Sequence, residues 1–158
     1  MTKAPLLQSL TYSFNGANII KWIEQKTGID GLVADHSLTG GGFCKVFPGS
    51  SLGLHTDFNW NDQIKLNRKV NLILYTNEEW HEEYNGALEF WNFDKTKCVK
   101  KLDPKPNRLA FWIYDTELVH GFPDPIKSPT GVSRDNLIIF YYTSNATWDK
   151  DPRRSQFE

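Results

Sequence analysis

The stretch GSSLGLHTDFNW, residues 49–60, places His55 and Asp57 one residue apart inside a segment that reads as a β-strand. Residues i and i+2 of a strand face the same side, so the imidazole and the carboxylate project from one surface. Together they can bind one metal ion, although a third donor is needed to occupy one face of it. An HxD pair alone also occurs by chance as a solvated surface pair, so its meaning depends on the rest of the chain.

Short apolar or alternating runs surround this stretch and favour a mainly β fold. Gly, Pro, Asn and Asp separate the runs, as they do at turns between strands. About nine short strands are expected, at residues 31–37, 42–47, 52–58, 69–76, 87–91, 97–102, 108–114, 117–122 and 136–143. Such a series of strands behind one helix predicts a double-stranded β-helix (jelly roll) or a barrel-like sandwich.

One helix is expected ahead of the strands, over residues 15–27. Three isoleucines recur at helical spacing in NGANIIKWIEQKT, with Asn15 as a plausible cap and Gly28 as a stop. The helix should pack on the β core. The charged segment EEWHEEYNG, residues 78–86, is interpreted as a solvated loop, with a helical turn as the alternative.

The composition predicts a single domain over residues 1–158, with its core at about 40–143 and a loosely held polar tail, NATWDKDPRRSQFE. The 18 basic and 19 acidic residues nearly cancel, so neither nucleic acid nor an anionic membrane surface is an expected partner. The two cysteines, Cys44 and Cys98, are expected to be reduced thiols. No apolar run approaches the roughly 20 residues that cross a bilayer, and a cytoplasmic protein is expected. The oligomeric state stays open.

Three histidines are candidates for the third metal donor. His36 precedes the HxD pair, and His81 lies among four glutamates in the segment interpreted as a loop. His120 closes the run TELVHGF directly after the strand RLAFWIY, and a jelly roll brings such distant strands together. We therefore expect His120 to complete the set. Two histidines and one carboxylate with three open positions describe the facial triad of non-haem Fe(II) oxygenases.

An arginine and a tyrosine point to an anionic ligand beside the metal. Arg134 lies fourteen residues after His120, at the entry to the apolar run DNLIIFYYT, where an inward guanidinium would need an anion such as a carboxylate. The alternative is that Arg134 caps the edge of the strand. Tyr75 shares a strand face with Ile73 and Asn71, and its hydroxyl could reach the same carboxylate; otherwise it is a core tyrosine.

With these residues in place, the sequence resembles the 2-oxoglutarate and Fe(II)-dependent dioxygenases. The resemblance is to the prolyl 4-hydroxylase-like branch that includes the hypoxia-inducible-factor prolyl hydroxylases, and it covers roughly residues 40–143. Four ordered blocks carry it: VFPGSSLGLHTDF, KVNLILYTNEEWHEEYNGALEFW, PKPNRLAFWIYDTELVHGFPDP and SRDNLIIFYYT.

The resemblance implies a cofactor set and a role for each site residue. Fe(II) would be held by His55, Asp57 and His120, and the far carboxylate of 2-oxoglutarate by Arg134 and Tyr75. With O2, and with ascorbate as a stimulant, the enzyme would hydroxylate a prolyl residue in a peptide or protein and release succinate and CO2. Related halogenases vacate the carboxylate position for a halide, so the presence of Asp57 favours hydroxylation.

The chain departs from the family pattern at two places. Phe47 stands where the hypoxia-type enzymes have a tyrosine that contacts the cosubstrate, so one contact is lost or replaced. The gap between His120 and Arg134, which contains PDPIKSPTG, is longer than in those enzymes and indicates an enlarged turn.

The substrate is the least determined part of the prediction. Trp91, Phe93 and Trp112 are candidates for lining a prolyl site, with core packing as the alternative. Hydroxylation of a free amino acid or another small molecule stays open. So do a non-catalytic cupin-like metal-binding protein and a hydrolytic zinc site built from the same ligands.

Overall fold

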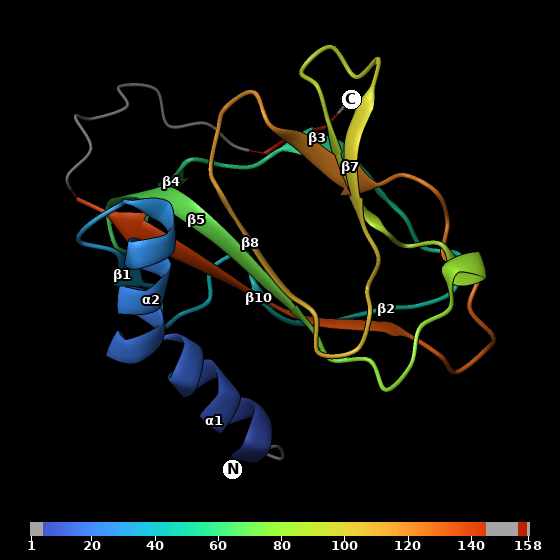
Figure 1. Cartoon of the computed structure of the whole chain (residues 1–158), viewed down its shortest axis with the longest axis horizontal. Coiled ribbons are helices and arrows are strands. Elements are labelled where there is room, and N and C mark those ends of the chain that lie inside the picture. The colour runs from blue at the N-terminus through green and yellow to red at the C-terminus, as the bar shows by residue number, and fades with distance from the viewer. Residues whose placement is uncertain (1–4, 145–154, 158) are drawn as a thin grey trace.

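The computed structural model describes residues 5–144 and 155–157. These residues form two antiparallel β-sheets that face each other, with two helices at one side (Figure 1). This arrangement confirms the predicted mainly β, jelly-roll fold.

The six-stranded sheet has the order β1-β10-β5-β4, with β2 also paired to β10 and β8 also paired to β5. Its strands are β1 (Val33–Ala34), β2 (Gly42–Val46), β4 (Trp60–Asn61), β5 (Leu66–Tyr75), β8 (Leu109–Ile113) and β10 (Arg134–Thr143). The five-stranded sheet has the order β11-β3-β9-β6-β7. Its strands are β3 (Leu52–Thr56), β6 (Leu88–Trp91), β7 (Cys98–Leu102), β9 (Val119–Phe122) and β11 (Gln156–Phe157).

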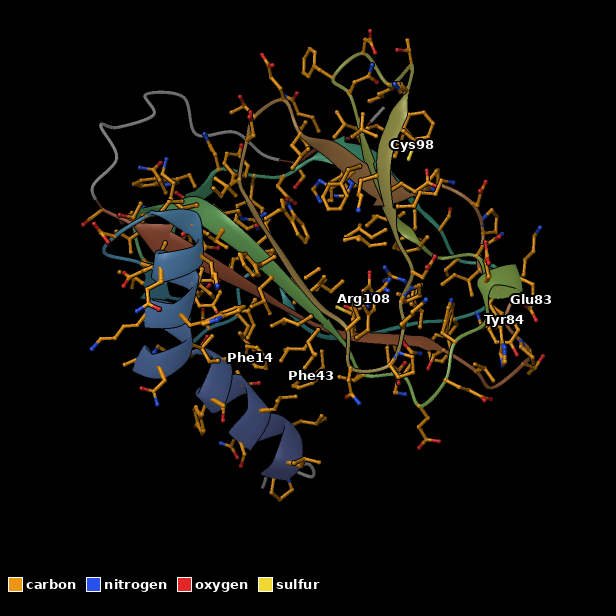
Figure 2. The ribbon with its side chains drawn as sticks, in the orientation of Figure 1. Phe14, Phe43, Glu83, Tyr84, Cys98 and Arg108 are labelled. Carbon is orange, nitrogen blue, oxygen red and sulfur yellow. The ribbon has the colours of Figure 1, made fainter. Side chains whose placement is uncertain are left out.

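Each strand expected from the sequence is present, and two more occur. The short strands β4 and β11 were not expected, and a 3-10 turn, η1 (Glu82–Tyr84), lies in the segment interpreted as a solvated loop. Glu83 and Tyr84 mark this turn in Figure 2. The prediction of a loosely held tail is wrong for residues 156 and 157, because they pair with β3. Residues 145–154 and 158 of that tail lie outside the described residues.

The expected helix is α2, Ala17–Thr27. Gly28 ends it as predicted, in the left-handed conformation with φ 71°, and its N–H donates to the carbonyl oxygen of Glu24. The prediction for Asn15 is wrong, because Gly16 is the N-cap and no side chain caps the first turn. Asn15 is buried instead.

An additional helix, α1 (Pro5–Phe14), precedes α2. None of its residues is fully buried, although Leu10 and Phe14 pack against the core cluster at helical spacing. Its end is nevertheless fixed, because the Tyr141 hydroxyl of β10 donates to the carbonyl oxygen of Phe14 at 2.9 Å. Phe14 is labelled where α1 meets α2 in Figure 2.

The helices cover the outer face of the six-stranded sheet (Figure 1). The core there contains Ile23 of α2 and alternate residues of β5 and β10, among them Leu72 and Ile139. The opposite face of β5 carries Ile73 and Tyr75, which pack with residues of the five-stranded sheet. One face of the sheet therefore forms the helix-covered core, and the other is left to build a site between the sheets.

None of the helices in the described ranges has the length and apolar character needed to span a bilayer. Cys44 and Cys98 are not joined by a disulfide. The single-domain organisation and the cytoplasmic location stay predictions.

Candidate metal centre

The three predicted metal donors lie together at the inner face of the five-stranded sheet. His55 of β3 and His120 of β9 are directly opposite each other in the strand pair, and Asp57 follows β3 immediately. Nε2 of His55 lies 3.8 Å from Oδ1 of Asp57, and Nε2 of His120 lies 3.4 Å from Oδ2. One donor atom from each residue lies within 4.8 Å of the others, so a single ion can contact all three.

A bulge and a glycine bring the two histidines face to face. The pairing of β3 with β9 shifts register between Leu52 and His55, which leaves an extra residue on β3. At that point a Cβ on Gly121 would lie 2.7 Å from the backbone oxygens of both Leu52 and Gly53. Only glycine fits this close approach, and the register of His55 against His120 depends on it.

Both imidazoles turn the same nitrogen toward the metal position. Nδ1 of His55 lies 2.9 Å from the carbonyl oxygen of Gly53, and Nδ1 of His120 lies 3.4 Å from that of Leu118. A tautomer that donates from Nδ1 leaves the lone pair of Nε2 free for a metal. Burial lowers the pKa of His120, which favours the neutral imidazole that metals require.

Two side chains of β5 hold the carboxylate of Asp57. Nδ2 of Asn71 donates to Oδ2 at 2.6 Å, and Nη1 of Arg68 lies 3.0 Å from the same oxygen. Both contacts orient the carboxylate. Both contacts are to Oδ2 of Asp57, and neither is to Oδ1.

Arg68 is a site residue that the sequence analysis missed. Its guanidinium is buried, with its carbon 3.7 Å from the ring centre of Phe58 and 3.5 Å from that of Phe140. Simple alternation along β5 would put Arg68 on the helix-covered face with Val70. A bulge at Lys69, where the pairing with β10 shifts register, turns Arg68 to the site face instead. A charged residue at the start of an apolar strand was the available signal.

A cavity of about 330 Å³ lies between the two sheets and contains this cluster. Side chains from both sheets project into that space in Figure 2, where Cys98 marks β7 of one sheet and Arg108 precedes β8 of the other. The five-stranded sheet and the residue that follows β3 contribute the metal donors, and both sheets contribute apolar side chains to the wall. Further lining residues are Leu52, Ile73, Leu88, Phe122 and Ile138.

Arg134 lines the same cavity and is 2% exposed. Its Nε donates to the carbonyl oxygen of Gly86 at 2.8 Å, and its Nη2 donates to the Tyr75 hydroxyl at 2.9 Å. Phe122 lies against the guanidinium, with its ring centre 4.5 Å away. Burial raises the pKa of Tyr75, so its hydroxyl stays protonated. Within the described ranges, no carboxylate forms an ion pair with Arg134.

Gly86 allows the backbone to approach this guanidinium. It has φ 78°, and a Cβ there would lie 3.2 Å from Cδ of Arg134. The connection before β10 is anchored as well, because Gly49 and Ser50 form backbone hydrogen bonds with Ile126. Arg134 is therefore held in the cavity at the end of this connection.

The remaining predicted residues separate into those in the cavity and those outside it. Trp112 lines the cavity, whereas Trp91 and Phe93 do not. Nε1 of Trp91 donates to Glu89, and Phe93 is 63% exposed. This placement gives no support to a lining role for those two. Phe47 is also largely exposed and outside the cavity wall.

The comparison with protein families matches residues 42–145 to the 2OG-Fe(II) oxygenase superfamily. No curated protein matches the chain. A solved structure of prolyl 4-hydroxylases from Phytophthora capsici is similar, with a TM-score of 0.62 and 21% identity over 96% of this chain and 50% of that chain. This similarity supports the fold.

Two other solved structures are more distant. A Pseudomonas putida prolyl-4-hydroxylase has a TM-score of 0.48 and 18% identity, over 88% of this chain and 62% of that chain. A Trichoplax adhaerens prolyl hydroxylase in complex with a peptide fragment of the hypoxia-inducible factor has a TM-score of 0.38 and 25% identity. The match covers 60% of this chain and 40% of that chain. The chain thus spans less than two thirds of the length of each of these structures.

Proposed function

The chain belongs to the 2OG-Fe(II) oxygenase superfamily, and we propose that it hydroxylates a prolyl residue in a peptide or protein and releases succinate and CO2. Members of this superfamily use Fe(II), 2-oxoglutarate and O2. Bound together, these supply the oxidising power for hydroxylation of a C–H bond. The protein's own part is to hold the cofactors, orient the substrate and exclude water.

His55, Asp57 and His120 fit Fe(II) by the chemistry of their donor atoms. Two imidazole nitrogens and one carboxylate form the facial set found in non-haem Fe(II) oxygenases, and they leave further positions open. One donor atom from each of the three residues lies within 4.8 Å of the others. Arg68 and Asn71 hold Oδ2 of Asp57 in place, as outer partners of metal ligands commonly do.

The single observation that carries the proposal is the buried guanidinium of Arg134. A buried charge is costly unless a partner of opposite charge compensates it. Among the described residues Arg134 bonds only to a neutral hydroxyl and a carbonyl oxygen, yet it lines the cavity that contains the metal donors. A dicarboxylate that reaches from the metal to Arg134 would supply the missing anion, with the Tyr75 hydroxyl as a second donor.

The prolyl substrate is supported by the fold similarity to the Phytophthora capsici prolyl 4-hydroxylases and by the apolar part of the cavity wall. Trp112, Phe58 and Phe140 contribute aromatic surface on the side that faces the metal donors. Such a wall suits a compact, uncharged ring. The carboxylate of Asp57 occupies the position that a halide would need, which favours hydroxylation.

The test is to incubate the protein with Fe(II), ascorbate, 2-oxoglutarate and O2, with and without proline-rich peptides. We expect peptide-dependent succinate release and a mass gain of one oxygen atom on a prolyl residue. His120→Ala, which removes one metal donor, is the control and should give neither.

Other outcomes would replace the proposal. Succinate release that only a free amino acid stimulates would keep the oxygenase and reject the peptide substrate. Metal binding without turnover would indicate a cupin-like binding protein. Activity that survives without O2 and 2-oxoglutarate would indicate a hydrolytic zinc site.

A further inference from the structure

Residues 155–157 reach the edge of the metal-bearing sheet. Gln156 and Phe157 form β11, which pairs antiparallel with β3, the strand that carries His55. Phe157 is directly opposite His55 in this pair. Side chains of directly opposite residues lie on the same face of a sheet, so Phe157 projects toward the cavity as His55 does.

The ring of Phe157 stacks on the imidazole of His55. The two ring centres are 4.6 Å apart, and the ring planes make an angle of 22°. Phe157 and Ser155 both line the cavity that contains His55 and Arg134. Phe157 as a whole is 58% exposed. It therefore has one face against a metal donor and a large part of its surface open to solvent at the cavity.

The exposure of the large apolar side chain of Phe157 beside the cavity indicates a role in binding. The exposed part of the Phe157 side chain contributes little to the stability of the fold. An aromatic ring beside an open cavity offers a large contact area to a ligand. The neighbouring cavity residues Trp112 and Phe140 provide the aromatic surface deeper inside. Phe157 extends that surface outward.

We propose that Phe157 is a specificity-determining residue that forms the outer wall of the substrate site and packs against the prolyl-containing segment of the substrate. This inference rests on the proposed function and adds a contact residue to it. The ring lies on the imidazole of His55, so a substrate that packs on its open side is held next to the metal position.

The experiment compares three variants with the wild-type protein. Phe157→Ala removes the ring, Phe157→Tyr keeps it, and Phe93→Ala is the matched control, because Phe93 is 63% exposed and outside the cavity wall. A proline-rich peptide is titrated into each protein loaded with Mn(II) and 2-oxoglutarate, and Mn(II) binding is measured separately by calorimetry. KM and kcat for the peptide are then measured with Fe(II).

Phe157→Ala should raise the peptide Kd and KM by about 2- to 12-fold, the effect of losing one aromatic contact. Its Mn(II) affinity should stay within about twofold of the wild-type value. Phe157→Tyr and Phe93→Ala should bind the peptide as the wild type does.

Three results would overturn the inference. An unchanged peptide Kd in Phe157→Ala would show that the ring is not part of the substrate site, although the proposed function would stand. Weaker Mn(II) binding with unchanged peptide binding would make Phe157 a support of His55 only. If the wild-type protein binds no prolyl peptide, the proposed function fails first and the inference fails with it.

Discussion

Two buried arginines line the same cavity, and their surroundings differ. Arg68 is 1% exposed, lies 3.0 Å from a carboxylate oxygen of Asp57 and is held between two phenylalanine rings. Arg134 is 2% exposed, and among residues 5–144 and 155–157 its hydrogen-bond partners are the Tyr75 hydroxyl and a backbone carbonyl oxygen. The charge of Arg68 is thus compensated within the protein, whereas we propose that an anionic ligand compensates that of Arg134. This difference separates the metal end of the cavity from its cosubstrate end.

Asp57→Ala should have the largest effect, because it removes a metal donor and leaves Arg68 without its carboxylate. We expect loss of metal binding and a decrease of about 3–5 kcal/mol in the free energy of unfolding, the usual cost of breaking a buried ion pair. Urea denaturation of the metal-free protein and Mn(II) titration measure the two effects. His120→Ala should also lose metal binding but should destabilise the protein less. Equal stability of Asp57→Ala and the wild type would contradict the role assigned to Arg68.

Arg68→Met tests the same ion pair by removing its cation. Methionine keeps the apolar stem and removes the charge, so the carboxylate of Asp57 loses its cation. We expect the free energy of unfolding of the metal-free protein to fall by up to about 3–5 kcal/mol, and metal affinity to fall about 10- to 100-fold because the ligand is less well oriented. Denaturation and metal titration are again the measurements. A variant that binds metal as tightly as the wild type would show that Asn71 alone positions Asp57.

Arg134→Met, unlike Arg68→Met, should not lower the free energy of unfolding. In the ligand-free protein it removes an uncompensated buried charge, so the free energy of unfolding should be unchanged or higher. Its 2-oxoglutarate Kd should instead rise about 10- to 150-fold, because hydrogen bonds to a charged group contribute roughly 1.5–3 kcal/mol. Denaturation without ligand and titration with 2-oxoglutarate give the two values. A strongly destabilised variant would mean that the two arginines play the same structural role.

Tyr75→Phe should have the smallest effect of the four. It removes one neutral hydroxyl at the cosubstrate end and keeps the aromatic ring in the core. The loss of one such hydrogen bond is worth about 0.5–1.5 kcal/mol, so the 2-oxoglutarate Kd should rise about 2- to 12-fold. Titration of the metal-loaded variant measures it. An unchanged Kd would assign Tyr75 to the core alone, the alternative that the sequence left open.

Much of the candidate site could be predicted because each of its residues carries a signal in the few residues around it. The spacing of His55 and Asp57 on one strand face, and the position of His120 after a strand, were enough to bring three donors together in a jelly roll. Arg134 was recognisable as a charge at the entry to an apolar strand. These signals depend on strand period and residue type, which the sequence shows directly.

The missed residues depend on features that the strand period does not contain. Arg68 reaches the site only because a bulge at Lys69 reverses the alternation of β5. Phe157 reaches it because a two-residue strand finds the edge of β3, and such a short strand has no local pattern. The helix α1 was not expected, although Leu7, Leu10 and Phe14 recur at helical spacing within it. In each case tertiary contacts decide the structure.

The most direct test of the central claim is calorimetric titration of 2-oxoglutarate into the Mn(II)-loaded protein, repeated with EDTA and with Arg134→Met. We expect saturable binding that EDTA abolishes and that Arg134→Met weakens about 10- to 150-fold. Absence of binding with metal present, or binding that neither EDTA nor Arg134→Met affects, would contradict it.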